Sequence, residues 1–240
     1  MEQFIKTIQN GEKIAVPGNT ISEMEAELKL SNWNEIVEQL LVTEEPPQTD
    51  ERVYLTVKTR YASTMVEHLI RYRLARLFAV NKHVLDLCCG CGYGTAILST
   101  VAKTVVGVDY AEDAVAWARR HYNYVHYLVM DAANLRFESE DFDLVVSMEA
   151  IEHVYDNDAY LSHVKRVLKP NGQFLFSTPH SSTGKLQHSP HGHHKWSFTH
   201  PFLKEQLTKY FGENVLLFSQ TDYGFEPLKI PCYYMGVCIK

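Results

Sequence analysis

Apolar residues along this chain follow two spacings, each typical of one kind of secondary structure. Short, mainly apolar runs are typical of buried strands and occur over 84–87, 104–109, 125–130, 142–147, 173–177, 215–221 and 232–239. Apolar residues three or four positions apart predict helices over 65–78, 111–121, 158–168 and 201–211. The alternation of the two patterns predicts an α/β protein with a doubly wound, parallel sheet.

The loop after the first of these runs carries the most distinctive chemistry. Asp86 lies near the end of the run, and Gly90, Gly92 and Gly94 then occupy alternate positions before a helical pattern begins at Thr95. Glycine lets the backbone turn tightly and lets a ligand lie against bare N–H groups at a helix N-terminus. The spacing differs from the Gly-x-Gly-x-x-Gly of dinucleotide sites, and the loop lacks the Gly-Lys-Ser/Thr of phosphate-binding loops. The loop therefore predicts a site for a nucleoside without phosphates.

Acidic residues also follow the next runs. Asp109 comes 23 residues after Asp86, close to where a ribose-binding carboxylate lies at the end of the second strand of a βαβ unit. One carboxylate can accept hydrogen bonds from both ribose hydroxyls. Asp131 follows the third run, and the fourth run leads into Met148 and Glu149. Polar strand ends in this order indicate a ligand site along one edge of the sheet.

Residues 83–180 resemble the class I S-adenosylmethionine-dependent methyltransferases. Residues 86–94 resemble the first motif of that family, Asp109 its ribose acid, and Asp131 with Ala132 its adenine-edge pair. The resemblance implies methyl transfer from S-adenosylmethionine and a Rossmann-like, mostly parallel seven-stranded sheet with an antiparallel last strand, preceded by an N-terminal helical cap. We predict the following cofactor-binding residues: Asp86, Cys88, Gly90, Gly92, Asp109, Tyr110, Asp131, Ala132, Met148 and Glu149.

Length and charge limit the organisation of the chain. For 240 residues we expect one domain with an extension, namely a helical cap and linker over 1–80 and the S-adenosylmethionine-binding core over 81–240. The net charge of −6 disfavours a broad nucleic-acid-binding face, although not a local basic patch. The chain has neither an apolar stretch of about 18 residues nor a basic, apolar leader at residue 1, so we expect a cytoplasmic protein without membrane contact.

The five cysteines admit two interpretations. Cys88, Cys89 and Cys91 cluster in the glycine loop, which could indicate metal or redox chemistry. The preferred interpretation is that they are small residues packed beneath a ligand. An odd count in a chain without a signal peptide predicts reduced thiols.

Two helices are predicted before the first strand, over 31–41 and 65–78. By resemblance, the second would cover the cofactor cleft. The polar residues in and before this helix have two interpretations, because they either approach the ligand or are ordinary polar positions of a packing helix: Tyr61, His68, Arg71 and Tyr72.

A long polar loop over 179–199 follows the fifth run. It holds five of the twelve histidines, and His200 follows it; the five are His180, His188, His191, His193 and His194. A loop of this length in a compact domain is usually functional or disordered. Because it leaves the carboxyl edge of the sheet, where ligands bind, we expect it to close over the acceptor.

The segment 149–153 adds a second cluster of ionisable residues. If it forms a helical turn, the spacing places Glu149, Glu152 and His153 on one face, where they could hold a divalent cation with a fourth ligand from the histidine loop. With the later His194, the segment resembles the metal-dependent small-RNA 2′-O-methyltransferases, and less closely the ubiquinone-pathway O-methyltransferases. The resemblance implies Glu149, Glu152, His153 and His194 as ligands of Mg²⁺ or Mn²⁺. In a metal-free relative, Glu149 would instead line the cofactor pocket and His153 would act as a base or a cap.

Three functional hypotheses follow. The leading one is methyl transfer to an oxygen or nitrogen of a small molecule, with His153 or His194 removing the acceptor proton where its pKa demands it. The second is a metal-assisted O-methyltransferase that acts on a catechol, sugar or RNA hydroxyl. The third is a non-catalytic protein that binds S-adenosylmethionine, against which the intact acids Asp86, Asp109 and Asp131 argue.

Overall fold

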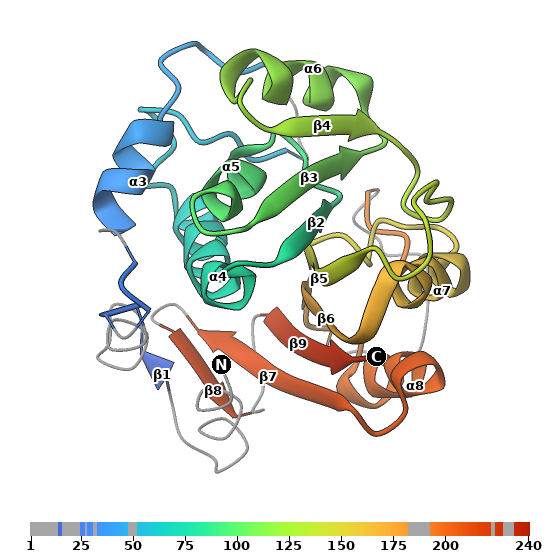
Figure 1. Cartoon of the computed structure of the whole chain (residues 1–240). Helices are drawn as coiled ribbons and strands as arrows, with labels where there is room; N and C mark the ends of the chain where they lie inside the picture. The colour runs from blue at the N-terminus through green and yellow to red at the C-terminus, as the bar shows by residue number, and fades with distance from the viewer. Residues whose placement is uncertain are drawn as a thin grey trace.

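The computed structural model describes residues 14–15, 25–26, 28–30, 33–47, 52–181, 193–221, 224–227 and 233–240. The strands are β1 (Ile14–Ala15), β2 (His83–Leu87), β3 (Thr104–Asp109), β4 (His126–Val129), β5 (Phe142–Met148), β6 (Leu168–Pro179), β7 (Val215–Thr221), β8 (Gly224–Pro227) and β9 (Tyr233–Ile239). The helices are α3 (Trp33–Leu40), α4 (Ser63–Ala79), α5 (Tyr93–Ser99), α6 (Glu112–His121), α7 (Asn157–Val167) and α8 (His200–Phe211). These elements form one sheet with helices on both faces (Figure 1).

The strand order in the sheet is β1-β8-β7-β9-β6-β5-β2-β3-β4. Neighbouring strands from β4 to β6 run parallel, whereas β9 is antiparallel to β6, and the pairs β7–β9, β7–β8 and β1–β8 are also antiparallel. The expectation of a mostly parallel sheet is therefore wrong, because half of the eight pairings are antiparallel and the sheet is mixed. The difference arises after α8, where the chain adds strands by antiparallel pairing instead of by helical crossovers.

The seven expected strands are all present, and β9 is the antiparallel strand expected at the end of the chain. The short strands β1 and β8 were not expected and extend the sheet at the β7 edge. β6 begins at Leu168, whereas the apolar run predicted a start at residue 173, because Leu168 pairs with Phe142 across a register shift. The five helices with predicted bounds are confirmed as α3, α4, α6, α7 and α8, each within a few residues of those bounds, and the helix expected to begin at Thr95 is confirmed as α5.

The two faces of the sheet bury two separate hydrophobic clusters. On one face, Val84 of β2 and Leu144 of β5 pack with α3, α4, α5 and α6. On the other face, the adjacent residues Leu85 and Val145 pack with α7 and α8, which lie on the right in Figure 1. Successive side chains of a strand point to opposite faces, so a strand covered on both faces must be apolar at nearly every position. This requirement explains the mainly apolar runs in the sequence.

α4 is buried on most of its surface, although it contains three arginines. Arg73 forms two hydrogen bonds to the Glu25 carboxylate, at 3.2 and 2.7 Å, and Arg76 lies 3.7 Å from the same carboxylate. Arg71 lies in the middle of the same helix and has different partners, described below. Paired charges of this kind can be buried because each is neutralised by its neighbour.

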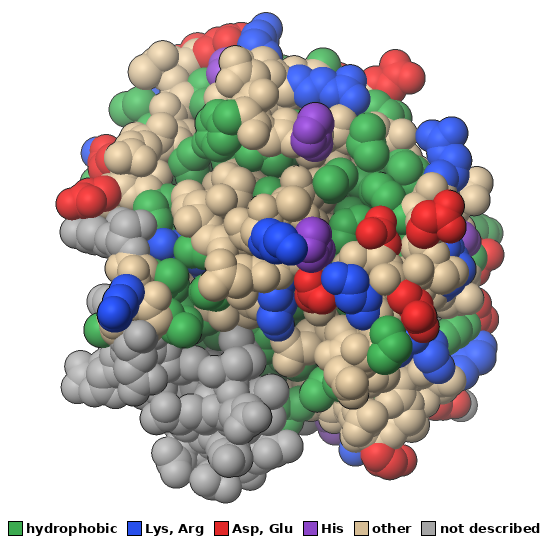
Figure 2. All heavy atoms as spheres, in the orientation of Figure 1, with side chains coloured by type: hydrophobic (Ala, Val, Ile, Leu, Met, Phe, Trp, Pro, Cys, Tyr) green, Lys and Arg blue, Asp and Glu red, His purple; other side chains and the backbone are tan. Residues whose placement is uncertain are grey.

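The surface is mixed in charge on the face that Figure 2 shows. There, Lys and Arg side chains are interspersed with Asp and Glu among the described residues. None of the described helices combines the length and the apolar character that crossing a membrane would require.

Candidate functional site

The glycine loop connects β2 to α5 in a sharp turn. Cys88, Gly90 and Gly92 have φ angles of 59°, 53° and 83°, in the left-handed region that favours glycine. A Cβ on Gly92 would lie 2.5 Å from a side-chain carbon of α6, and one on Gly94 would overlap the ring of Tyr72. These two glycines therefore permit close packing. At Gly90, no heavy atom of the described residues lies within 4 Å of the place a Cβ would take, so this backbone faces open space.

Asp109 ends β3 beside this loop. Its Oδ2 accepts a hydrogen bond from the Gly90 N–H at 2.9 Å, and its Oδ1 accepts one from the Ala111 N–H at 3.0 Å. These two bonds fix the carboxylate next to the open side of the loop. Each carboxylate oxygen can accept a second hydrogen bond, so Asp109 retains the capacity to bind hydroxyl groups of a ligand.

Asp86 is fully buried and is bonded to protein hydroxyls. Thr95 Oγ1 donates to its Oδ2 at 2.7 Å, and Tyr72 OH donates to its Oδ1 at 3.1 Å. Burial raises the pKa of Asp86 to about 7, although both hydroxyls favour the ionised form. Asp86 thus ties the glycine loop to α4 and α5, and its contact with a cofactor stays a prediction.

The other residues predicted to bind the cofactor lie along the same edge of the sheet. Tyr110 follows β3, Asp131 and Ala132 follow β4, and Met148 ends β5. The Tyr110 side chain is 70% exposed and accessible to a ligand, whereas Met148 and Ala132 are buried. Asp131 Oδ1 accepts a hydrogen bond from the Ala133 N–H at 2.8 Å, which fixes the carboxylate. Because the carboxyl ends of parallel strands meet at one edge, the fold places these residues together.

The cysteines of the loop lie where burial disfavours the thiolate form. Burial raises the pKa of Cys88 and of Cys89 well above the ordinary thiol value, and raises the pKa of Cys91 to about 12. Thiolates are the form that binds metals and reacts with oxidants. Among the described residues, the group able to hold a metal ion includes none of these cysteines. These features favour the packing interpretation.

The chain after β5 does not form the expected helical turn. Glu149 has a φ of 50°, which takes the chain out of the strand, and a turn follows in which the His153 N–H donates to the Ala150 carbonyl at 2.9 Å. The Glu149 N–H and Oε1 both bond the Ser177 hydroxyl of β6, at 3.0 and 2.5 Å. The expectation of a shared helical face for Glu149, Glu152 and His153 is therefore wrong, because β6 holds Glu149 in a left-handed conformation.

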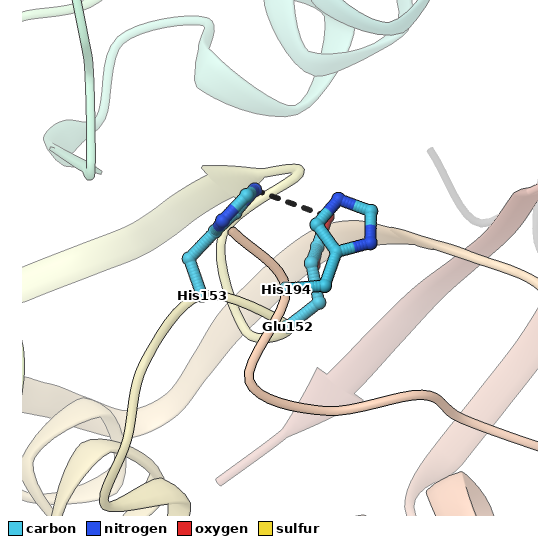
Figure 3. Close-up of side chains that lie close together, drawn as sticks. All are labelled: Glu152, His153 and His194. Carbon is cyan, nitrogen blue, oxygen red and sulfur yellow. Dashed lines mark ion pairs between the residues drawn. The ribbon is translucent and has the colours of Figure 1, made fainter. Parts of the chain in front are cut away.

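Three of the four proposed metal ligands nevertheless come together. The side chains of Glu152, His153 and His194 lie close together (Figure 3), and each has one potential ligand atom within 4.8 Å of the others. The two imidazole rings are nearly perpendicular, with centroids 4.8 Å apart. Glu149, the fourth expected ligand, is not part of this group.

Backbone hydrogen bonds bring His194 to this position. The N–H groups of Lys195 and Trp196 donate to the Glu152 carbonyl at 2.7 and 3.0 Å. The carbonyl of His193 lies 3.2 Å from His153 Nδ1. The segment before α8 is thereby held against the turn after β5. Residues 182–192 of the histidine loop, with His188 and His191, lie outside the described residues, so the expected closure of this loop stays a prediction.

The electrostatics of this group suit acid–base or metal chemistry. Burial lowers the pKa of His153, so its imidazole is neutral at pH 7, and the His193 carbonyl favours the tautomer with the proton on Nδ1. Nε2 is then the basic nitrogen, and it lies 4.0 Å from Glu152 Oε1. Glu152 Oε2 accepts from Thr178 Oγ1 at 2.8 Å, whereas Oε1 is buried without a hydrogen-bond partner among the described residues. Burial, reinforced by the nearby Glu149, raises the pKa of Glu152 well above its usual range.

The sequence analysis missed Ser177 and Thr178, which position Glu149 and Glu152. Both hydroxyl residues stand near the end of a buried apolar strand, at the edge where the acids of the other strands lie. That position is the signal that could have identified them. Of the polar residues in and before α4, Arg71 lies 3.6 Å from Glu149, whereas Tyr61 is 76% exposed and His68 bonds Tyr93 OH through Nδ1 at 2.7 Å.

The chain is similar in sequence to known methyltransferases. Residues 85–176 match the family model described as a methyltransferase domain. Over 116 residues, the chain is 36% identical to a protein of Mycolicibacterium smegmatis named as a probable S-adenosylmethionine-dependent methyltransferase, covering 48% of this chain and 45% of that protein. It is 33% identical over 161 residues to a ubiquinone biosynthesis O-methyltransferase of Bradyrhizobium diazoefficiens, covering 60% of this chain and 62% of that protein. The chain thus spans about half the length of the first of these relatives.

Solved structures share the fold. A methyltransferase of Thermotoga maritima, described as a possible histamine N-methyltransferase, superposes with a TM-score of 0.63 at 16% identity and covers 76% of this chain and 94% of its own. A protein of Pyrococcus horikoshii gives a TM-score of 0.58 at 23% identity, over 76% of this chain and 96% of its own.

Proposed function

We propose that this chain is a class I S-adenosylmethionine-dependent methyltransferase and that it transfers a methyl group to an oxygen or nitrogen of a small molecule. The observation that carries the proposal is the open backbone at Gly90 beside the fixed carboxylate of Asp109. A nucleoside can approach the backbone there, and its ribose hydroxyls can donate to Asp109.

The residues along the strand ends fit the cofactor. Residues 88–92 would lie against its amino-acid part, Asp109 would bind the ribose, and Asp131 with Ala132 would contact the adenine edge. The Tyr110 side chain is exposed enough to cover the adenine ring of the cofactor. The cofactor supplies an electrophilic methyl group on a positively charged sulfur. Because the methyl group is already activated, the protein mainly aligns donor and acceptor.

His153 is the residue best placed to accept a proton from the acceptor. Its neutral imidazole presents the basic Nε2, because Nδ1 faces the His193 carbonyl. General-base catalysis requires this unprotonated form at the working pH. His194 lies against the same ring and would orient it or share the proton.

Cofactor binding is tested by calorimetry with S-adenosylhomocysteine on the wild-type protein and on Asp109→Asn. The amide keeps one acceptor oxygen for the loop but loses the charge-assisted hydrogen bonds to a ribose, so we expect affinity to fall by one to two powers of ten or about 1.5–3 kcal/mol. Asp113→Asn is the matched control, because Asp113 starts α6 nearby and pairs with Arg52 at the surface. Unchanged affinity in Asp109→Asn would remove the assignment, and tight binding of NAD would indicate a dehydrogenase.

A second candidate function is metal-assisted O-methylation, which the group of Glu152, His153 and His194 favours. The buried Glu152 Oε1 has no hydrogen-bond partner among the described residues, and a cation would satisfy it. The His153 ring also has its other nitrogen against a backbone carbonyl, as imidazole ligands commonly do. A cation in this group would lower the pKa of an acceptor hydroxyl.

The identity of the metal follows from the donor set. With Glu149 outside the group, two of the three donors are nitrogens, so Mn²⁺ is preferred over Mg²⁺, which demands oxygen ligands. Titration of Mn²⁺ followed by electron paramagnetic resonance should give one site in the wild-type protein and none in His194→Ala. His126→Ala, at the exposed edge strand β4, is the control. Full methyl transfer in chelator-treated enzyme would exclude this second function while leaving the first intact.

A further inference from the structure

Arg71 of α4 is a buried cation with unused hydrogen-bond donors. Its side chain is completely buried, and its Nε donates to Gln220 Oε1 at 2.5 Å. Neither Nη1 nor Nη2 has a hydrogen-bond partner among the described residues. Each of these nitrogens carries two N–H groups. Buried donors without partners are rare and destabilising, so their presence here requires an explanation.

The charges around Arg71 are already offset. Nη1 lies 3.6 Å from Glu149 Oε1, and Nη2 lies 3.9 Å from Glu67 Oε2. Both distances exceed the usual length of an N–H···O bond, so the carboxylates supply charge but leave the donors unsatisfied. One guanidinium faces two carboxylates, and an anionic ligand group would meet repulsion from Glu67 and Glu149.

Arg71 lies beside residues at the ends of β5 and β7 and at the start of β9. Glu149 follows β5, Gln220 lies near the end of β7, and Tyr233 begins β9 with its ring 4.1 Å from the guanidinium carbon. These residues lie at the same sheet edge as the glycine loop, because β9 runs antiparallel beside the end of β6. Apart from Met148 and Glu149 at the end of β5, the predicted cofactor residues lie at the ends of β2, β3 and β4, which leaves the ends of β6, β7 and β9 for the second substrate.

The hydrogen-bond donors of Arg71 lie beside the hydrogen-bond-accepting carboxylate of Glu149, and few ligand groups can bond both. An ammonium group only donates, so it would leave the guanidinium unsatisfied, and a carboxylate only accepts. A hydroxyl group accepts from Arg71 and donates to Glu149 at the same time. Two neighbouring hydroxyls match the fork of the guanidinium, whose two η nitrogens point in nearly parallel directions.

We propose that Arg71 and Glu149 form an acceptor-binding pair that selects an uncharged acceptor with two neighbouring hydroxyl groups, one of which is methylated. The inference rests on the proposed methyl transfer and makes it specific for oxygen. Sugars and catechols both offer vicinal hydroxyls, and Arg71 recognises the chemistry that they share. The acceptor oxygen bonds the methyl carbon as the carbon–sulfur bond of S-adenosylmethionine breaks, S-adenosylhomocysteine is the leaving group, and the hydroxyl proton passes to the base His153. The ether product can no longer donate to Glu149 and leaves more readily.

A purely structural role for Arg71 makes different predictions. If the guanidinium only offsets the charge of Glu149, then Arg71→Lys retains that function, because lysine carries the same charge. The lysine ammonium lacks the planar fork, so it cannot reproduce a paired hydrogen bond to two hydroxyls. Arg71→Lys therefore separates recognition of the acceptor from stabilisation of the fold.

The experiment uses the full chain saturated with S-adenosylhomocysteine and four probes: pyrocatechol, methyl α-mannopyranoside, benzoate and benzylamine. Binding is measured by saturation-transfer-difference NMR on the wild-type protein, on Arg71→Lys and on Arg76→Lys. Arg76 is the matched control, because it is buried in the same helix but faces Glu25 and Thr100, outside the site. We expect at least one of the diols to bind and Arg71→Lys to weaken it by about ten- to a hundredfold, while melting temperature and affinity for S-adenosylhomocysteine stay near wild type.

The outcomes separate this inference from the proposed function. Preferential binding of benzoate or benzylamine, or failure of both diols to bind, would overturn the selection of neighbouring hydroxyls. Equal diol binding in Arg71→Lys and the wild-type protein would show that the guanidinium serves only as a charge. Failure of S-adenosylhomocysteine to bind would instead overturn the proposed methyl transfer. Which diol binds more tightly distinguishes a sugar from an aromatic acceptor.

Discussion

Replacing Gly94 with alanine should destabilise the protein strongly, although the change adds only one methyl group. The new Cβ would overlap the ring of Tyr72, which is buried at 4% exposure between α4 and the glycine loop. The ring must move, and its hydroxyl then loses the 3.1 Å bond to Asp86. Overpacking costs about 1–3 kcal/mol and the lost bond about 1–3 kcal/mol, so we expect a loss of about 2–6 kcal/mol. That is a large part of the stability of a typical domain, about 5–15 kcal/mol.

Urea unfolding followed by circular dichroism measures this loss, and Gly90→Ala is the matched control. Alanine at Gly90 meets no heavy atom of the described residues within 4 Å, so only the left-handed backbone, with a φ of 53°, opposes it, at about 1–2 kcal/mol. Because a ligand would lie in that open space, Gly90→Ala should instead weaken binding of S-adenosylhomocysteine.

A double-mutant cycle tests the cause. In a Tyr72→Ala background, Gly94→Ala should cost much less, because the ring that it displaces is gone. The reasoning fails if Gly94→Ala is no less stable than Gly90→Ala, or if the cost of Gly94→Ala is the same with and without the Tyr72 ring.

Two further predictions concern charged residues. Burial raises the pKa of Asp86 from 3.8 to about 7, so the folded state binds the Asp86 proton more tightly than the unfolded state does. The stabilisation from protonated Asp86 is therefore fully present below about pH 4 and is lost as the pH rises to about 7. Asp86→Asn removes this pH dependence, so the free energy of unfolding of the variant relative to wild type should rise by about 1.4 kcal/mol per pH unit in that window. Urea unfolding at pH 5 and 7 measures this difference, and a constant difference would contradict the raised pKa of Asp86. Glu25→Ala removes the buried carboxylate that pairs with Arg73 and should lower the free energy of unfolding by about 3–5 kcal/mol. Glu44→Ala removes a half-exposed partner of Arg120 and should lower it by about 0–1 kcal/mol. Similar losses in the two variants would refute this contrast between buried and exposed ion pairs.

Local sequence patterns were sufficient to predict most of the strands and helices of the fold. The apolar runs predicted seven strands, because strands covered on both faces are apolar at most positions. Alternate glycines predicted the turn between β2 and α5, because Gly90 and Gly92 adopt positive φ and Gly94 lies against Tyr72. The short strands β1 and β8 have too few residues for a periodic pattern to emerge, and their pairing depends on the neighbouring strand.

The candidate site was accessible from the sequence only in part. The acids at the strand ends could be placed, because parallel strands bring their carboxyl ends to one edge. The conformation of Glu149 could not be predicted from the sequence, since it depends on hydrogen bonds to Ser177 in another strand. The spacing of residues 149–153 suggested a helical turn, whereas the tertiary contacts impose a left-handed backbone conformation at Glu149.

The sequence by itself determined which residues are apolar strand positions, where the glycine loop lies and which acids follow the strands, because these properties depend on neighbours in the chain. Tertiary structure alone decided that β1 and β8 extend the sheet, that Glu149 lies outside the group of Glu152, His153 and His194, and that Arg71 is buried with donors that find no partner among the described residues. These features join residues far apart in the chain, and their geometry is set by packing and backbone hydrogen bonds such as those from Lys195 and Trp196 to Glu152. Spacing along the sequence carries no record of such contacts.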